Sequence, residues 1–476
     1  MTTASHIAEA DSPKSELKRS ITGRLLFFYV LGDVLGSGIY VLIGAVAAAV
    51  GGAFWIAFAV GVTVAAITGL AYAELVTKYP QAAGAALYVN KAFRKPILTF
   101  LITICMLSAS FAASGSLASG FARYFGQLFP LPPPLLVTIL FVLALTAINY
   151  IGITESVVAN MIMTIVEVSG LAIVMLIGII YVFQGNADWG ALTEFSAEGN
   201  PIFAIVAGVA LAFFAMTGFE NAANVAEETI NPSKTFPRAL IGGMVAAGVI
   251  YVIVAISAAL VVPVDTLAAA PAALLEVVRA GILPVPVGVM IILFALIAMT
   301  AITNTTLVAV VTQSRILYGM SRENIFPKMF RKLHSTRRSP WVALIFQGIV
   351  VAVLLSVGAL VKLVNPELDI VATLANVTVV FLLFIYALVI VSALKLRGTE
   401  ERPDTYRANT PLLYVGIVGN VVLLAYVIID DPSSLLWVAG LLAVGFLLYL
   451  WEYFSKKRHG GSVGLPDADD MDDMEV

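Results

Sequence analysis

Three small residues interrupt a long apolar run near the start of the chain. Gly36 and Gly38 flank Ser37 and supply no side chains at a position where an unbroken helix would close its hydrogen bonds. A break here leaves free N–H groups at the start of the second half-helix, whose dipole also attracts an anion. Carbonyl groups before the break, near Val34, can accept hydrogen bonds from an ammonium group. Together these groups predict a site for a ligand that carries a carboxylate and an amine, such as an α-amino acid.

Glycines in a membrane helix have a second interpretation, because small residues also let two helices pack closely. The glycines near the N-terminus alone leave both interpretations open. A second interrupted apolar run favours the binding site, and it contains Thr217, Gly218, Phe219 and Glu220. Interrupted helices in corresponding positions of two halves are typical of transporters whose substrate binds near the middle of the membrane.

The composition indicates that these apolar runs lie in a membrane. The chain has 476 residues, of which 60% are hydrophobic and 12% are charged, whereas soluble domains carry about 25% charged residues. Apolar runs of about 20 residues, long enough for the hydrocarbon core, recur along most of the sequence. Only helices or closed barrels satisfy their backbone in lipid, and continuous runs exclude the alternating pattern of a barrel. The sequence therefore predicts an all-α integral membrane protein.

The apolar runs divide into twelve predicted transmembrane helices. Prolines begin several of them, as expected at a first helical position that needs no N–H partner; these are Pro134, Pro201, Pro237 and Pro340. The predicted spans are residues 24–48, 53–77, 97–122, 134–151, 156–183, 201–229, 237–262, 284–318, 341–361, 369–394, 410–429 and 433–454.

Basic residues gather on alternate loops between these spans. If the N-terminus lies in the cytoplasm, all of the 27 lysines and arginines except Arg123, Arg279 and Lys362 fall in cytoplasmic segments. This distribution predicts a multi-pass protein of the plasma membrane with both termini in the cytoplasm. Spans 1 and 6, which hold the interruptions, then cross the membrane in opposite directions, as an inverted repeat of five plus five helices requires.

The predicted domain organisation follows from this repeat. Acidic residues dominate the last ten positions, which predicts a disordered and solvated C-terminal tail. The predicted segments are a cytoplasmic tail at 1–23, a first repeat at 24–183, a second repeat at 184–396, two further helices at 397–457 and the acidic tail at 458–476.

The sequence lacks the residues that a disulfide, a metal site or a nucleotide-binding site requires. Cys105 is the single cysteine, so neither a disulfide within the chain nor a cysteine-based metal site can form. The three histidines, His6, His334 and His459, lie in tails or a loop, and the sequence has no phosphate-binding loop. The sequence thus predicts a protein that is not an enzyme, uses no cofactor or metal and binds no nucleic acid. It leaves the oligomeric state open.

Four stretches of the sequence resemble the amino acid, polyamine and organocation (APC) transporter superfamily. They are GSGIY at 36–40, AYAEL at 71–75 followed by YPQAAGAALY at 79–88, GFENAANVAEETINPSKTFPRA at 218–239, and SRILYGMSRENIFP at 314–327. The resemblance implies the LeuT-type fold, a five-plus-five inverted repeat with broken helices 1 and 6. It is much less specific to a substrate.

The resemblance also assigns roles to the interrupted segments. It implies that N–H groups of residues 36–38 receive the substrate carboxylate. Carbonyl groups near Val34 and in residues 214–217 would receive the amino group, and Phe214 or Phe219 would cover the bound substrate. The rest of the pocket would come from residues 105–111 of span 3, from span 8 and from span 10 near Asn376.

Four acidic residues within predicted spans stand out, because an ionisable group there costs a few kcal/mol and often marks function. They are Asp33, Glu74, Glu167 and Glu220. Glu74 lies near the cytoplasmic end of its span, where we expect a structural role, and Asp33 faces the inner vestibule or pairs with a basic residue. Glu220 directly follows the second interruption. It either takes part in gating and proton coupling or holds the unwound backbone by hydrogen bonds.

Glu167 is a candidate for ion coupling, because it lies near the middle of span 5 in a long stretch without other charges. In the LeuT-type fold this face of span 5 lies near spans 1 and 8, where Thr303, Asn304 and Thr305 would supply neutral oxygens. The resembled transporters hold a sodium ion or place a lysine there, so a glutamate departs from their pattern. Burial raises the pKa of a carboxyl group, which suits the loading and release of a proton. Asp33 is a further coupling candidate, and a neutral glutamate that bonds a neighbouring helix is the alternative.

These expectations combine into one predicted function. The sequence predicts a secondary transporter that carries amino acids across the plasma membrane lipid bilayer by alternating access, with H+ as the coupling ion in a symport. One alternative is an exchanger of amino acids or polyamines, for which Asp33, Glu167 and Glu220 would supply negative charge. Another is a transporter-like receptor that binds an amino acid without moving it.

Overall fold

The fold consists almost entirely of helices. The computed structural model describes residues 21–151, 157–458 and 465, except 81–83, 197–199, 227, 323, 336–338 and 400–403. Among these residues the regular structure is helical apart from one isolated bridge between Ile21 and Thr229. Eleven helices are long and apolar enough to cross a membrane, and a bent pair near the N-terminus forms a twelfth span when its two helices are taken together. The predicted all-α membrane fold is therefore confirmed.

The helix bounds agree closely with the predicted spans. They are α1 (Gly23–Leu35), α2 (Gly38–Val50), η1 (Gly52–Phe54), α3 (Trp55–Lys78), α4 (Gly84–Phe93), α5 (Pro96–Leu128), α6 (Pro134–Ile151), α7 (Val157–Phe183), η2 (Trp189–Thr193), α8 (Pro201–Ala215), η3 (Phe219–Val225), α9 (Pro232–Val261), α10 (Val264–Ala269), α11 (Ala273–Arg279), α12 (Val287–Arg322), η4 (Lys328–Arg331), α13 (Trp341–Val364), α14 (Ile370–Lys395), α15 (Thr410–Asp430) and α16 (Ser434–Arg458).

The start of α9 differs from its prediction. The sequence favours Pro237 as the first residue, but the helix begins at Pro232 and Pro237 lies inside it. Asn231 has a left-handed backbone (φ 49°) and turns the chain, so Pro232 takes the first helical position, where the missing N–H costs nothing. Either Pro232 or Pro237 could begin a helix, so the sequence alone did not identify the first residue of α9.

Both predicted interruptions are present. The first span bends by 40° between α1 and α2, at Gly36 and Ser37. The sixth span ends its α-helix at Ala215 and continues only as the short 3-10 helix η3. Gly218 has φ +113° at this second break, a conformation that residues with a side chain rarely adopt. The breaks thus lie where the small residues predict them.

The two breaks lie against each other in space. A side chain at Gly38 would come within 2.4 Å of the Cα atom of Ala215, and one at Gly218 would come within 2.6 Å of the carbonyl oxygen of Asp33. Glycine is therefore required at both positions for the two interrupted spans to approach. This contact places both breaks at one point inside the helix bundle.

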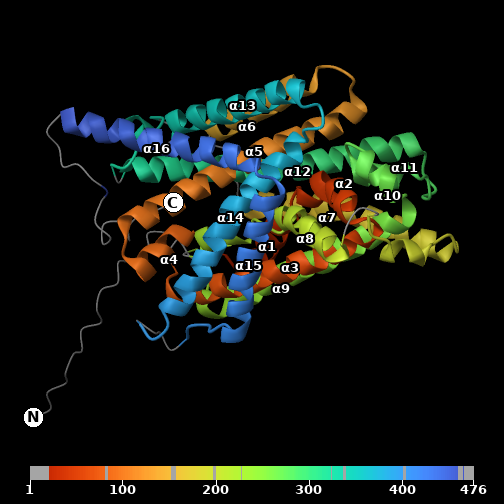
Figure 1. Ribbon diagram of the computed structural model, residues 1–476, viewed down its shortest axis with the longest axis horizontal. Helices are drawn as coiled ribbons and strands as arrows, with labels where there is room; N and C mark the ends of the chain where they lie inside the picture. Colours follow the sequence, from red (N-terminus) through yellow and green to blue (C-terminus); the bar gives the residue numbers. More distant parts are fainter. Residues whose placement is uncertain are drawn as a thin grey trace, which may run out of the picture.

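The helices run between two ends of the bundle, which define its sides. We call the side where α1 begins the N side and the opposite side the far side. In Figure 1 α4 and the end of α16 lie at the left, on the N side, and α10 and α11 lie at the right, on the far side. Helices α6 and α13 form the upper edge of this view, α3 and α9 the lower edge, and the broken spans lie between them.

Two regions between spans hold helices that the apolar runs do not reveal. The segment between spans 2 and 3 contains α4, which has only ten residues and is too short for a span. The segment between spans 7 and 8 contains two short helices, α10 and α11. The apolar side chains Leu267, Leu274 and Leu275 are fully buried there, so this apolar face packs on the protein rather than on lipid.

Candidate substrate-binding site

A cavity lies where the two breaks face α5, α12 and α14. Most of the residues predicted to bind substrate line it, together with two of the coupling candidates. The predicted residues in its wall are Val34, Ser37, Phe214, Thr217, Gly218, Glu220, Asp33 and Thr305. The structure thus brings two segments that are about 180 residues apart in sequence into one site.

The Ser37 side of the cavity has features of an anion site. The Ser37 hydroxyl is fully buried and has no hydrogen-bond partner among the described residues. The Ser37 N–H donates to Thr305 Oγ1 at 3.2 Å. Helix α2 begins at the next residue, so its first N–H groups have no carbonyl partner within the helix and its dipole points its positive end here. A carboxylate in this part of the cavity would meet several donors.

Gly36 and Gly38 serve packing as well as the break, and neither is among the cavity-lining residues. A side chain at Gly36 would lie 2.6 Å from Thr305 Oγ1, and Gly38 touches the backbone of α8 at Ala215. The packing interpretation of these glycines is therefore correct in part. Their side-chain hydrogens leave room for Thr305 and α8, while the adjacent Ser37 faces the cavity.

Tyr251 of α9 joins the carbonyl ends of the two broken spans. Its hydroxyl lies 2.5 Å from the Val34 carbonyl oxygen and 3.1 Å from the Ala215 carbonyl oxygen. A single O–H can donate to only one of these acceptors at a time. The side chain is fully buried, so it fixes the spacing of the two carbonyls that could receive an ammonium group. The sequence analysis missed this residue, because it lies in a uniformly apolar helix.

The side chain of Glu220 forms hydrogen bonds at the second break. Its Oε2 atom accepts hydrogen bonds from the Gly218 N–H at 2.8 Å and from the Tyr386 hydroxyl at 2.7 Å. The bond to the Gly218 N–H is the kind of contact that the structural interpretation of Glu220 requires. Glu220 also lines the cavity, so the same carboxyl group stabilises the unwound backbone and contributes negative charge to the site.

The two candidate aromatic residues occupy different places. Phe214 lines the cavity and is 5% exposed. Phe219 is buried instead in an aromatic cluster, with its ring centroid 5.6 Å from that of Tyr72 and 5.2 Å from that of Tyr386. Phe214 is thus the aromatic side chain that can cover a ligand, while Phe219 supports the break.

The rest of the cavity wall comes mainly from α5, α12 and α14, the helices that the resemblance implies as spans 3, 8 and 10. Span 3 contributes Met106, Ala109 and Ser110 from the predicted stretch. Span 10 contributes Thr378, Leu382 and Ile385, which follow the predicted Asn376 along the helix; Asn376 itself is not among the lining residues. The sequence could name the helix here but not its inward face, because nearly all sides of α14 are apolar.

Comparisons with known proteins identify the family of the chain. The sequence model of the amino acid permease family matches residues 23–458, nearly the whole chain. The chain belongs to the amino acid permease family. The permease is 27% identical over 426 residues to the branched-chain amino acid permease BcaP of Bacillus subtilis, which covers 84% of this chain and 85% of that protein. It is 24% identical to the low-affinity putrescine importer PlaP of Escherichia coli, over 94% of this chain and 96% of that protein.

The comparison with solved structures supports the fold. The permease superposes on a manganese transporter of Eremococcus coleocola with a TM-score of 0.60, covering 95% of this chain and 98% of that chain at 14% identity. This likeness confirms the predicted LeuT-type fold with its broken helices. Membership of the APC superfamily is likewise confirmed, and the protein is a transporter rather than an enzyme.

The remaining coupling candidates of the permease lie outside the cavity. Glu167 of α7 is fully buried, and its Oε1 atom accepts a hydrogen bond from Asn304 Nδ2 at 3.2 Å. Its own carbonyl oxygen accepts a hydrogen bond from Tyr40 of α2 at 2.7 Å. The Thr303 hydroxyl donates to Met299 within α12 instead. Glu167 therefore contacts span 8 through Asn304, and α7 contacts the second half of span 1.

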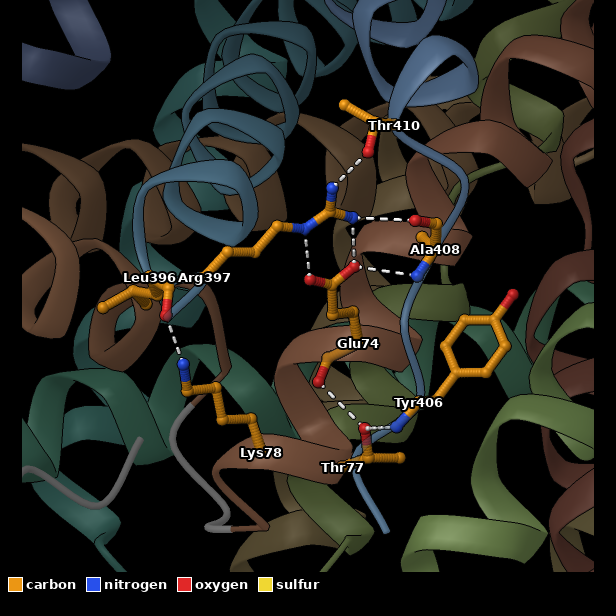
Figure 2. A network of polar contacts seen from close by, with 8 residues as sticks. All are labelled: Glu74, Thr77, Lys78, Leu396, Arg397, Tyr406, Ala408 and Thr410. Atoms are coloured by element: carbon orange, nitrogen blue, oxygen red, sulfur yellow. Dashed lines mark hydrogen bonds and ion pairs between the residues drawn. The ribbon is translucent and has the colours of Figure 1, made fainter. Parts of the chain in front are cut away.

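Glu74 is part of a polar network on the N side of the permease (Figure 2). Arg397, which follows α14, donates from Nε to Glu74 Oε1 at 2.8 Å and from Nη2 to Glu74 Oε2 at 2.7 Å. The backbone N–H of Ala408 donates to Glu74 Oε2 at 2.9 Å, and Arg397 also donates to Thr410 Oγ1 at 2.6 Å. The structural role expected for Glu74 thus has a partner that the sequence could not name.

Proposed function

We propose that the permease carries an amino acid across the plasma membrane by alternating access and that proton binding drives this transport. The substrate carboxylate binds at the start of α2 and at the Ser37 hydroxyl. Its ammonium group binds across the cavity, near the carbonyl groups held by Tyr251 and near Asp33 and Glu220. The observation that carries this proposal is the buried, unpartnered Ser37 hydroxyl beside the N-terminus of α2.

The names of similar proteins leave the substrate open. They include a branched-chain amino acid permease, a methylthioribose transporter of Bacillus subtilis that is 26% identical over 404 residues, and a putrescine importer. Putrescine has no carboxylate for the donors at Ser37. The anion-binding features of this part of the cavity therefore favour an amino acid over a polyamine.

Glu167 is the residue that we propose to bind the coupling proton. Its side chain is fully buried where α7 packs on α12. The hydrogen bond from Tyr40 to the Glu167 backbone carbonyl joins α7 to α2, the half-helix that we propose to receive the substrate carboxylate. Protonation of the Glu167 carboxyl group would remove a charge beside Asn304 and so alter the packing of α7 on α12. Glu220 is a weaker candidate, because its Oε2 atom is already committed to Gly218 and Tyr386.

The orientation and the repeat belong to the same proposal. Helices α3, α12 and α14 end on the N side, where most of the basic residues of the chain lie. The positive-inside rule therefore favours a cytoplasmic N side with both termini in the cytoplasm. The inverted repeat would then comprise residues 24–183 and 184–396, which places the two breaks in opposite directions.

Uptake by purified protein in proteoliposomes tests the function. We expect accumulation of a labelled amino acid when an inward proton gradient is imposed, and none with an inward sodium gradient alone. In Glu167→Gln, which keeps the shape and the Asn304 contact, we expect loss of this accumulation. Exchange between labelled substrate outside and unlabelled substrate inside should persist in this variant, because the binding site is intact.

Each alternative gives a distinct result in the same assay. Uptake that occurs only when the liposomes hold unlabelled amino acid would identify an exchanger and return Glu167 to a structural role. Binding of an amino acid without any uptake or exchange would identify a receptor. Proton-driven uptake that is unchanged in Glu167→Gln would contradict the coupling role and leave Glu220 and Asp33 to be tested.

A further inference from the structure

Negative charge in the cavity gathers at one end. Glu220 accepts a hydrogen bond from the Gly218 N–H at 2.8 Å. A side chain at Gly218 would lie 3.4 Å from the carboxyl carbon of Asp33, so both carboxyl groups lie beside this residue. Both acids also line the cavity. The charged end of the site is therefore the end formed by the two breaks.

The part of the cavity wall that α5, α12 and α14 form is uncharged. The lining residues from α5, α12 and α14 are all alanine, aliphatic, methionine, serine or threonine. Two of the threonine hydroxyls are already hydrogen-bonded to other groups of the protein. Thr378 donates to the Leu374 carbonyl at 2.9 Å, and Thr305 accepts from the Ser37 N–H and donates to the Ala301 carbonyl. This wall therefore offers mainly apolar surface to a ligand.

We propose that the substrate is an amino acid with a neutral aliphatic side chain, which lies against the wall formed by α5, α12 and α14. This inference rests on the proposed function, because the carboxylate and ammonium groups must be held at the breaks. A lysine side chain anchored there would place its second charge on the uncharged wall, where desolvation of an unpaired charge is costly. A polyamine meets the same obstacle, since Asp33 and Glu220 can receive only one of its ends.

Small residues set the size of this wall. Ala109 and Ala113 of α5 and Ala309 of α12 line the cavity, together with Leu382 and Ile385 of α14. Alanines leave space that a branched or unbranched aliphatic chain can fill. Burial of each additional methylene group of the substrate is favourable until the side chain fills the space beside these alanines.

Competition in proteoliposomes tests the inference. We expect unlabelled leucine, isoleucine, valine and methionine to suppress uptake of labelled leucine when present in excess. Lysine, arginine and putrescine should leave it unchanged. Suppression by lysine or putrescine as strong as that by leucine would overturn the inference while leaving a transporter. Failure of every compound to be taken up or exchanged would overturn the proposed function itself.

A variant of the wall gives a second and independent test. In Ala309→Leu the added side chain fills part of the space, and we expect the ratio of leucine to alanine uptake to fall about tenfold, as is usual when a pocket loses room for methylene groups. Val289→Leu is the matched control, because Val289 lies on the same helix and is 56% exposed at the lipid-facing surface. The ratio does not depend on protein yield. An unchanged ratio in folded Ala309→Leu would overturn the assignment of this wall.

Discussion

Helix α14 is tied to its surroundings by an ion pair at each end, and the two pairs differ. On the far side, Asp369 caps the start of α14 by accepting from the Val371 N–H at 2.9 Å, and it pairs with Arg123 of α5. These side chains are 41% and 26% exposed. On the N side, Arg397 pairs with Glu74 of α3, and these side chains are only 12% and 6% exposed.

The difference indicates which side of the transporter is held more firmly. An Arg–carboxylate pair with two parallel hydrogen bonds is stronger than a single contact, and removing one partner of a buried pair leaves an uncompensated charge. An exposed pair contributes between nothing and about 1 kcal/mol. The tie between α14 and α3 on the N side is therefore the stronger one. The tie between α14 and α5 on the far side can open at little cost.

Arg397 stays protonated in this strong tie at physiological pH. The hydrogen bonds that Arg397 donates to Glu74 raise the pKa of Arg397 above its usual value, and burial beside Glu74 raises the pKa of Tyr406 in the same loop. A base with a raised pKa stabilises the fold at any pH below its ordinary pKa and loses that contribution only above it. For arginine this range lies far above physiological pH.

The largest effect that we predict is that of Arg397→Ala. This change leaves Glu74 buried without its ion-pair partner, and we expect a loss of about 3–5 kcal/mol of stability together with loss of transport. Thermal unfolding in detergent and uptake in proteoliposomes measure the two effects. Arg397→Lys should recover only part of the loss, because an ammonium group cannot form the two parallel hydrogen bonds. A melting temperature equal to that of the wild type would show that the N-side pair is no stronger than the far-side pair.

Helix α14 has a third tie near its middle, where Tyr386 donates to Glu220. In Tyr386→Phe one acceptor bond of Glu220 is lost, and we expect a destabilisation of about 1–3 kcal/mol. Because Glu220 also bonds the Gly218 N–H, the apparent KM for substrate should rise more than kcat falls. Uptake kinetics with and without the substitution separate the two parameters. A change in stability with an unchanged KM would mean that this tie supports the helix but not the binding site.

The sequence predicted the parts of this arrangement that depend on local chemistry. Long apolar runs specify the spans, and the small residues around Ser37 and Gly218 specify the breaks. The partners across the bundle were not predictable, because Glu74 and Arg397 are 323 positions apart and Tyr251 is 217 positions from Val34. Nothing in an apolar sequence states which faces of two helices will meet. The buried acids could therefore be identified as important before their partners were known.

The glycines show a second limit of the sequence. A small residue in a membrane helix suits both a break and close packing, and Gly38 proves to serve the contact with α8 while Ser37 faces the cavity. Which of the two roles a glycine has depends on where the neighbouring helix lies, and the sequence does not give that position. The residue of the motif that we propose to bind substrate is therefore the serine between the glycines, whose hydroxyl the packing leaves without a partner among the described residues.

The smallest effect that we predict is that of Arg123→Gln on the far side. The pair with Asp369 is partly exposed, and Asp369 keeps its bonds to the start of α14 after the change. We expect a loss of stability below about 1 kcal/mol, which high salt should reduce further in the wild type by screening. Thermal unfolding at low and high salt measures this effect. A loss as large as that in Arg397→Ala would contradict the difference between the two ends of α14, because it would mean that the exposed pair holds the helix as firmly as the buried one.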